Sequence, residues 1–184
     1  MKYCSLCGSQ DLIFKVPSGD SLPRYICGGC ETIHYVNPKI IVGAIPTYKD
    51  QILLCKRAIE PRKGKWTLPC GYMENGETVE EGAARETLEE ANARIVIKNL
   101  QSVYSIPYIN QVYLVFNSEL LDLDFSAGEE SLEVELFNEE DIPWSEIAFS
   151  AIKFSLETFL QDRKEGNLHI TRVGRYALNK KDKF

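Results

Sequence analysis

The sequence GYMENGETVEEGAARETLEEANA, residues 71–93, combines a run of glutamates with residues that favour a helix. Its seven glutamates are Glu74, Glu77, Glu80, Glu81, Glu86, Glu89 and Glu90. Thr78 and Glu81 stand three positions apart ahead of an Ala- and Leu-rich run, which is the spacing of a capping box. We therefore predict a helix that begins at about Val79 and is ended by Asn92.

This helix is predicted to have two different faces. At 100° per residue, one stripe holds small or apolar side chains, namely Ala84, Thr87, Leu88 and Ala91. On the opposite side, Glu86 and Glu90 form an i,i+4 pair of like charges, which costs an isolated helix about 0.2–0.5 kcal/mol. A divalent cation with oxygen ligands would reverse that sign. The plain alternative is an acidic face that only meets solvent, which is the usual role of a charge run.

The spacing of the glutamates relative to a glycine and an arginine favours a cation-binding site over a solvated acidic face. A glycine is followed six positions later by a glutamate, and eight positions after that by the run Arg-Glu-x-x-Glu-Glu. This order resembles the Nudix box, and six of its fixed positions match: Gly71, Glu77, Arg85, Glu86, Glu89 and Glu90.

Three positions depart from the family's pattern. Thr87 and Ala93 replace aliphatic residues, and Asn92 replaces the glycine that closes the helix. Asparagine is a mild replacement there, because after glycine it adopts the left-handed conformation most readily. We expect all three departures to spare the chemistry.

The resemblance implies an α+β fold, an α/β/α sandwich with a mixed sheet, in which the box forms a loop-helix-loop that binds Mg²⁺ or Mn²⁺. It also implies an activity. The ions activate a water that attacks a phosphorus of a nucleoside diphosphate linked to another moiety. A pyrophosphate is polyanionic, so bare carboxylates would repel it and metal ions must lie between them.

The same resemblance implies roles for individual residues. Three glutamates match the family's metal ligands: Glu86, Glu89 and Glu90. Cys70 stands where a backbone carbonyl completes the coordination, so its thiol is expected only to pack. Arg85 matches the residue that orients Glu77 through an ion pair.

A further carboxylate, serving as base or metal ligand, comes in many relatives from a segment well after the box. Residues 128–133 are the best placed supply here, and Glu130 and Glu133 are the candidates. Ordinary loop carboxylates are the alternative for both.

Candidate substrate contacts lie on both sides of the box. Arg57 and the basic loop that contains Arg62, Lys63 and Lys65 are expected to hold phosphates, although solvated surface cations are an equal alternative. Three tyrosines, Tyr104, Tyr108 and Tyr113, are candidates for stacking a base, and core packing is the alternative for strand tyrosines.

The N-terminal segment carries a second metal-binding pattern. Cys4-x2-Cys7 and Cys27-x2-Cys30 are separated by nineteen residues, the paired-knuckle pattern of a tetrahedral zinc site. Two disulfides are the alternative, but they belong to secreted chains. Four thiolates leave no open coordination position, so we predict a structural Zn²⁺ in a ribbon of residues 1–36.

The rest of the chain predicts a Nudix domain over residues 37–166. Strands are expected at residues 39–47 and 51–57 as a hairpin, and further strands at 95–106, 111–121 and 132–137. Residues 144–164 are predicted to form a second helix that packs on the sheet. The basic residues 167–184 are expected to be a partly ordered C-terminal tail.

Composition narrows the compartment and the partners. The longest apolar stretch, residues 40–45, is far shorter than the roughly 20 residues that a membrane-spanning helix needs. The N-terminus lacks a signal-peptide apolar region. We therefore expect a cytoplasmic protein with no membrane partner, although a cleaved organelle-targeting segment would be invisible in a mature sequence.

The net charge of −6 disfavours binding to nucleic acid and leaves a small nucleotide as the expected partner. A homodimer is left open.

Substrate choice rests on further resemblance. Residues 35–39, 54–57 and 130–133 look like the ADP-ribose and FAD pyrophosphatase branch, and the Ser-Gln-Pro-Trp-Pro-Phe-Pro-like array of NADH pyrophosphatases is absent after the box. The expected reaction is cleavage of FAD or ADP-ribose to AMP and a second monophosphate. An NADH, NAD or capped-RNA pyrophosphatase is the alternative. A non-catalytic nucleotide-sugar sensor and a nucleic-acid-binding zinc ribbon are alternatives of a different class.

Overall fold

The computed structural model describes residues 1–177 and divides the chain into two compact units, Met1–Asn37 and Pro38–Phe184. The four paired cysteines lie in the first unit and the glutamate-rich helix lies in the second. None of the helices in the described part of the chain is long and apolar enough to cross a membrane.

The first unit is a three-stranded antiparallel sheet in the order β1-β2-β3. Its strands are β1 (Leu12–Lys15), β2 (Arg24–Cys27) and β3 (Ile33–His34). The unit buries Cys4 and Cys27, while several of its large apolar side chains, such as Phe14, are exposed. So small a unit has too little apolar burial to be stable alone, and such units are commonly held by disulfides or a metal.

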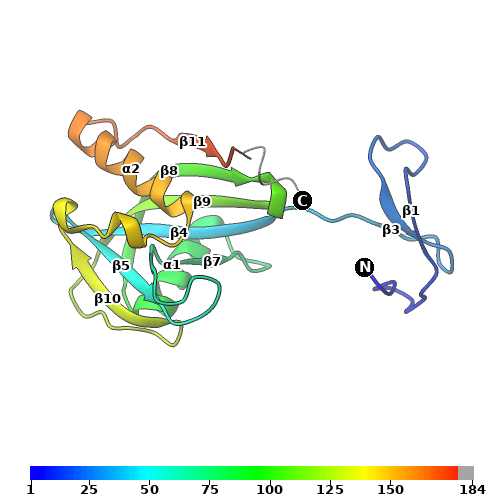
Figure 1. The fold of residues 1–184 in the computed structure, drawn as a ribbon, viewed down its shortest axis with the longest axis horizontal. Helices are drawn as coiled ribbons and strands as arrows, with labels where there is room; N and C mark the ends of the chain where they lie inside the picture. The colour runs from blue at the N-terminus through cyan, green and yellow to red at the C-terminus, as the bar shows by residue number, and fades with distance from the viewer. Residues whose placement is uncertain (178–184) are drawn as a thin grey trace. The chain divides into compact units, whose positions relative to one another are not determined.

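The second unit is built on a mixed sheet in the order β10-β5-β4-β9-β8-β11, with β6 paired to β5 and β7 paired to β4 (Figure 1). The strands are β4 (Lys39–Tyr48), β5 (Gln51–Arg57), β6 (Trp66–Thr67), β7 (Cys70–Tyr72), β8 (Ile95–Ile106), β9 (Gln111–Leu120), β10 (Ser131–Phe137) and β11 (Arg172–Arg175). The pairs β4–β9 and β8–β11 are parallel, and the others are antiparallel.

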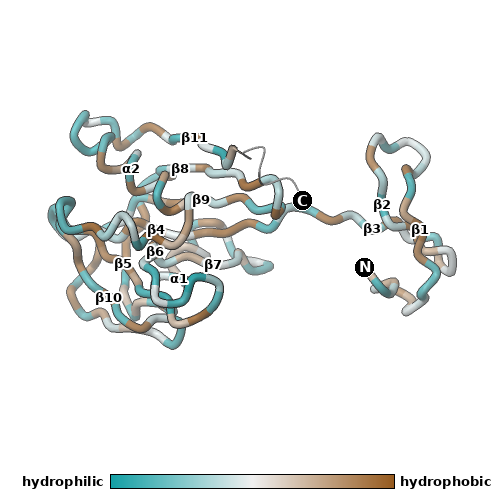
Figure 2. Tube along the Cα trace, in the orientation of Figure 1, coloured by the Kyte–Doolittle hydropathy of each residue, from teal (hydrophilic) through white to brown (hydrophobic). Residues whose placement is uncertain are grey.

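Strand β4 shows why the unit has three layers. Residues 41–46 are all buried, which is the pattern of a strand covered on both faces. Ile45 packs in a cluster with Ile152 of α2 (Ser150–Glu165), whereas Val42 packs with Ala83 of α1 (Val79–Ala91). Figure 2 shows the hydrophobic residues concentrated along these central strands. The α+β class and the α/β/α sandwich predicted from the sequence are confirmed.

The second helix begins later than predicted. Residues 144–146 form a single 3-10 turn, and α2 starts only at Ser150. Ile147 forms a parallel bridge with Trp66, and the Ala148 N–H donates to the Trp66 carbonyl at 2.8 Å. These backbone contacts hold the segment extended and delay the helix.

The expected C-terminal tail is partly wrong. Residues 172–175 form β11, which extends the sheet beside β8 in parallel. The basic residues of this segment suggested that it lies in solvent. Arg172, however, forms an ion pair with the buried Asp162 of α2, so its charge does not prevent the strand from joining the sheet. The basic residues Lys180, Lys181 and Lys183 lie outside the described residues.

Candidate active site and cysteine cluster

An open cleft of about 970 Å³ lies in the second unit, and α1 and β7 provide one of its walls. Its charged lining comprises seven carboxylates and three guanidinium groups: Glu60, Glu74, Glu86, Glu89, Glu90, Glu129, Glu130, Arg57, Arg62 and Arg85. Seven against three leaves a surplus of four negative charges if all are ionised. Cations bound in the cleft would relieve that repulsion.

Helix α1 begins and ends as predicted. Thr78 and Glu81 form the capping box, and Asn92 takes the left-handed conformation with φ of 47°. The Thr87 hydroxyl donates to the Ala83 carbonyl at 2.8 Å, so this departure from the family's pattern is buried without an unpaired polar group.

The predicted buried stripe of α1 is only half right, however, because Thr87 and Ala91 are buried as expected and the other two residues are not. Leu88 is 50% exposed and Ala84 only half-buried, whereas Glu86 and Glu90 are 8% and 6% exposed. The residues that contact the sheet side are Ala83, Thr87 and Ala91, and this rotation carries the neighbouring carboxylates inward. A helix that buries two carboxylates and exposes a leucine is arranged against its own hydrophobic pattern, which points to function.

Gly71 is where the box comes closest to these carboxylates. A Cβ atom at residue 71 would lie 2.3 Å from Oε2 of Glu86, far inside contact distance. The glycine therefore makes room for the Glu86 carboxylate beside β7, and any side chain at residue 71 would displace it.

Burial sets the acidity of the two inner glutamates. It raises the pKa of Glu90 to about 8, although the Cys70 N–H, 3.3 Å from Oε2, opposes the shift. Burial also raises the pKa of Glu86, opposed by the Arg85 guanidinium 2.8 Å away. Burial thus favours the protonated form of both carboxylates, whereas a bound cation would favour the ionised form.

Arg85 connects most of the remaining box residues. Its Nε and Nη2 atoms each donate to Glu77 at 2.9 Å, so the expected ion pair is present and bidentate. The guanidinium also donates to Glu86, to Glu89 at 3.1 Å and to the Tyr72 carbonyl at 3.1 Å. Together with the Glu74 N–H, it lowers the pKa of Glu77 to about 2.

A pH dependence follows from Glu90. Its pKa rises from 4.5 to about 8 on folding, so the folded, metal-free protein holds a proton that the unfolded chain has already lost. Stability without divalent cation should therefore fall as the pH rises from about 5 to about 8. Saturating Mg²⁺ should flatten this slope, because it favours the carboxylate.

Melting temperatures across this pH window, with and without Mg²⁺, test the expectation. Glu90→Gln should lose most of the slope, and Glu80→Gln, at an exposed position of the same helix, should keep it. A metal-free melting temperature that climbs over this window would contradict the assignment.

The loop after β9 delivers a further carboxylate. The Ser126 and Gly128 N–H groups donate to the carbonyls of Ala91 and Glu90, which caps the end of α1 and places Glu130 in the cleft lining. Glu133 lies outside the lining, exposed on β10, with its carboxylate 3.0 Å from Lys56 Nζ. Of the two candidates from the sequence, only Glu130 therefore faces the cleft.

The predicted substrate contacts divide in the same way. Arg57, Tyr108 and, of the basic loop, Arg62 line the cleft. Lys63 and Lys65 of the same loop do not. Tyr104 is buried against Phe154 in the core, with ring centroids 5.1 Å apart. We correct the expectation that it binds a base.

Several cleft residues are absent from the sequence-based set: Tyr72, Gln111, Glu129, Phe149 and Tyr176. Glu129 directly precedes the candidate Glu130, so its place in the acidic segment 128–133 was the signal that could have found it. The three aromatic residues come from segments far apart in sequence, and no local pattern marks them.

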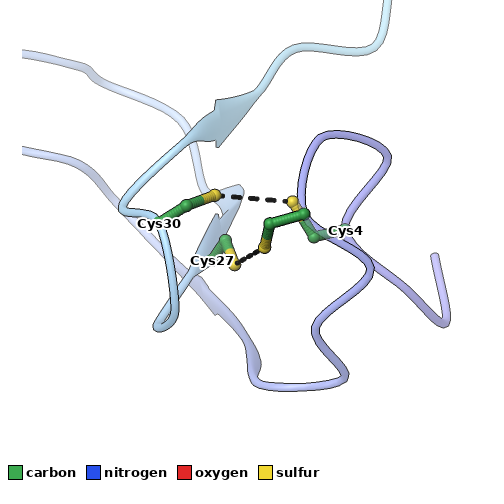
Figure 3. A group of neighbouring side chains, drawn as sticks. Cys4, Cys27 and Cys30 are labelled. Atoms are coloured by element: carbon green, nitrogen blue, oxygen red, sulfur yellow. Dashed lines mark hydrogen bonds between the residues drawn. The ribbon is translucent and has the colours of Figure 1, made fainter.

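The cysteine cluster in the first unit consists of Cys4, Cys7, Cys27 and Cys30, whose sulfur atoms all lie within 4.8 Å of one another. Figure 3 shows Cys4, from the N-terminal segment, converging with Cys27 and Cys30, which lie at the end of β2 and in the turn after it. The closest pairs are 3.5 and 3.7 Å apart, and all four thiols are free. A tetrahedron with Zn–S bonds of about 2.3 Å has sulfur atoms about 3.8 Å apart, so the cluster fits Zn²⁺.

Thr32 tunes one of the four thiols. Its hydroxyl lies 3.1 Å from the Cys30 sulfur and lowers the pKa of that thiol to about 6. A thiolate is the form that binds metal, so this contact favours binding.

The cleft carboxylates are arranged differently. Within residues 1–177, the cysteine cluster is the only group of three or more potential ligands gathered so closely. The Arg85 guanidinium donates hydrogen bonds to Glu86 and Glu89, and the Cys70 N–H donates to Glu90. These contacts spread the three carboxylates along one wall of the cleft. Such an open set fits ions that keep water and substrate oxygens as ligands, as Mg²⁺ does.

Comparison with known families gives two matches. A model of the NUDIX domain matches residues 37–157, and a model of the zinc ribbon described as Nudix N-terminal matches residues 2–36. A crystal structure of a NUDIX hydrolase from Nitrosomonas europaea is similar at 56% identity with a TM-score of 0.91, covering 96% of this chain and 99% of that one.

Two further relatives have more specific names. An ADP-ribose pyrophosphatase from Methanocaldococcus jannaschii is 35% identical over 113 residues, which is 59% of this chain and 67% of that protein. The NAD-capped RNA hydrolase NudC of Shigella flexneri is 31% identical over 147 residues, 77% of this chain and 53% of that protein. The chain thus spans about half of that RNA hydrolase.

Proposed function

The chain belongs to the NUDIX family, whose model matches more than half of it, and we propose that it is a metal-dependent pyrophosphohydrolase. The proposed substrate is a nucleoside diphosphate linked to another moiety. The observation that carries this proposal is the pair of buried carboxylates, Glu86 and Glu90, in the wall of a cleft with surplus negative charge.

Glu86, Glu89 and Glu90 are the proposed ligands of Mg²⁺ or Mn²⁺, and the Cys70 carbonyl is the proposed backbone ligand. When bound, such ions neutralise the pyrophosphate and activate the attacking water. Arg85 fixes Glu77 and the helix face by its five donors, a positioning role. Glu130 is the proposed base or additional ligand, because it lies in the cleft lining.

Arg57 and Arg62 are proposed to hold the phosphates that the ions leave uncovered. Arg57 lies over the Phe149 ring, 5.1 Å from its centroid, and its Nε donates to the Pro61 carbonyl at 2.9 Å. These contacts fix the guanidinium at the cleft and leave its other N–H groups available to a phosphate.

The cysteine cluster is proposed to bind one structural Zn²⁺. Its closed set of four sulfurs leaves no position for a substrate, and the unit that contains it has almost no apolar core.

FAD or ADP-ribose is the proposed substrate, and water would divide it into AMP and a second monophosphate. The similarity to an ADP-ribose pyrophosphatase supports this choice, as does the missing array after the box. The similarity to NAD-capped RNA hydrolases favours a second candidate, an NAD-type or capped-RNA substrate. The net charge of −6 disfavours long RNA, whose binding relies on Lys and Arg.

A Mg²⁺-dependent panel tests the substrate. ADP-ribose, FAD, NADH, NAD⁺, a nucleoside triphosphate and an NAD-capped RNA should be compared at equal concentration, with products separated by chromatography. We expect kcat/KM for ADP-ribose or FAD to exceed the others by about tenfold, which corresponds to about 1.4 kcal/mol. A kcat/KM at least tenfold higher for one of the other substrates than for both ADP-ribose and FAD would refute the proposed substrate but not the proposed reaction class.

A further inference from the structure

Tyr176 reaches the cleft from the C-terminal end of the described chain. It follows β11 directly, and its ring lies 5.2 Å from that of Tyr108, with 52° between the ring planes. Tyr108 belongs to the short 3-10 helix of residues 107–109 that joins β8 to β9, and both tyrosines line the cleft. We call these two residues the aromatic pair.

Two backbone features fix Tyr176 in this place. Its N–H donates to the Ser105 carbonyl at 2.9 Å, which continues the ladder between β11 and β8. Two residues earlier, a Cβ at Gly174 would lie 2.7 Å from the rings of Tyr104 and Phe154. The glycine thus lets β11 lie flat on these buried rings.

A buried ion pair anchors the start of β11. Arg172 makes a two-pronged contact with Asp162, which is fully buried in α2 and also accepts a hydrogen bond from Gln101 of β8 at 2.9 Å. The strand is therefore tied to both elements that flank it, and Tyr176 is held by a rigid support.

The position of the pair suits a base. Strands β4 and β9 separate β7, which carries Gly71, from the connection that carries Tyr108. At about 4.8 Å per strand, the separation is on the order of 10–15 Å, comparable with the length of one extended nucleotide. Between the two ends, Gln111 donates to the Tyr72 hydroxyl at 3.2 Å, and both side chains line the cleft.

We propose that β11 is part of the substrate site: Tyr176 positions Tyr108 as the platform on which the base of the substrate stacks. This inference rests on the proposed function, because it assigns the far end of the same cleft. The rings already contact each other, so a base cannot enter between them and stacks on the free face of Tyr108, which is 50% exposed. Tyr176 is a positioning residue that restricts the Tyr108 rotamer and lowers the entropy lost on binding.

Steady-state kinetics with ADP-ribose give the first test. Tyr108→Ala should raise KM about tenfold, in the range for the loss of one base stack, and Tyr176→Ala about fivefold, with kcat little changed in both. Tyr176→Phe keeps the ring and should restore most of the affinity. Val173→Ala is the matched control, because Val173 lies on the same strand but is 77% exposed and outside the cleft lining.

Binding without turnover gives the second test and separates the two proposals. Calorimetry should show weaker AMP binding in Tyr108→Ala and Tyr176→Ala, while ribose 5-phosphate, which has no base, should bind all variants equally. If the wild-type protein hydrolyses none of the substrates, but both alanine variants still bind AMP more weakly than it does, the proposed function is refuted and the base platform is supported. AMP affinities equal to wild type in both alanine variants, or an equal loss for ribose 5-phosphate, would overturn the platform.

Discussion

Glu86→Gln and Glu90→Gln should each lower kcat/KM at least about a hundredfold while the second unit stays folded. Each removes one charge from the wall proposed to bind the cations, and losses of this size are usual when a group that stabilises transition-state charge is removed. Isothermal titration with Mg²⁺ should show weaker binding for both variants. Steady-state assays with the preferred substrate measure the loss directly.

Although their kcat/KM values fall, the two metal-free variants should be at least as stable as the metal-free wild type. Burial disfavours ionisation of both carboxylates, and a neutral amide of nearly the same shape avoids that cost. We therefore expect melting temperatures near neutral pH no lower than that of the wild type. Glu80→Gln should change neither rate nor Mg²⁺ affinity. Variants of Glu86 and Glu90 that keep wild-type rates with every substrate would remove the basis for the metal-site assignment.

Cys27→Ser should unfold the first unit and leave the second folded. The buried Cys27 supplies one of four sulfurs, and the unit has too little apolar burial to persist without them. In a two-dimensional NMR spectrum, the amide signals of residues 1–36 should collapse to the unfolded range, while those of the sheet of the second unit stay dispersed. Metal analysis should fall from about one Zn per chain to near zero.

Ser5→Ala provides the control for that experiment, because Ser5 is exposed between two of the cysteines. It should retain the metal and the spectrum. A wild-type protein purified with less than about a tenth of one Zn per chain, but with a folded first unit, would show that the cluster needs no metal.

The sequence predicted those parts of the fold that depend on neighbouring residues. The ends of α1 follow from Thr78, Glu81 and Asn92, which act within one turn of the helix. The strands β4, β5 and β8 follow from continuous β-rich runs, and their bounds agree with the expected ranges within one residue. The cysteine cluster was predictable because two short turns each contribute two thiols at a fixed spacing.

The errors arise where distant segments decide the outcome. The face of α1 that turns inward is set by the sheet, so a hydrophobic stripe could not show that Leu88 is exposed and Glu90 buried. Glu130 and Glu133 stand three residues apart, and contacts with distant segments distinguish them. Main-chain bonds to α1 and to Ala58 hold the loop of Glu130 at the cleft, whereas Glu133 lies on β10 outside the lining. Tyr176 was overlooked because a basic segment suggested solvent, whereas Asp162 in α2 neutralises Arg172.

The cap on α1 has a consequence for redesign of the enzyme. The loop is attached to the helix by main-chain bonds, from the Ser126 and Gly128 N–H groups to the last carbonyls of α1. Gly128 is sterically fixed, since a Cβ there would lie 1.8 Å from the Glu89 carbonyl oxygen. A mutant library at position 129, which lines the cleft beside Glu130, would therefore vary the charge and size of the cleft rim while the main-chain cap and the proposed base are kept. This position is thus the place where the loop could be changed to alter which leaving group the cleft accepts.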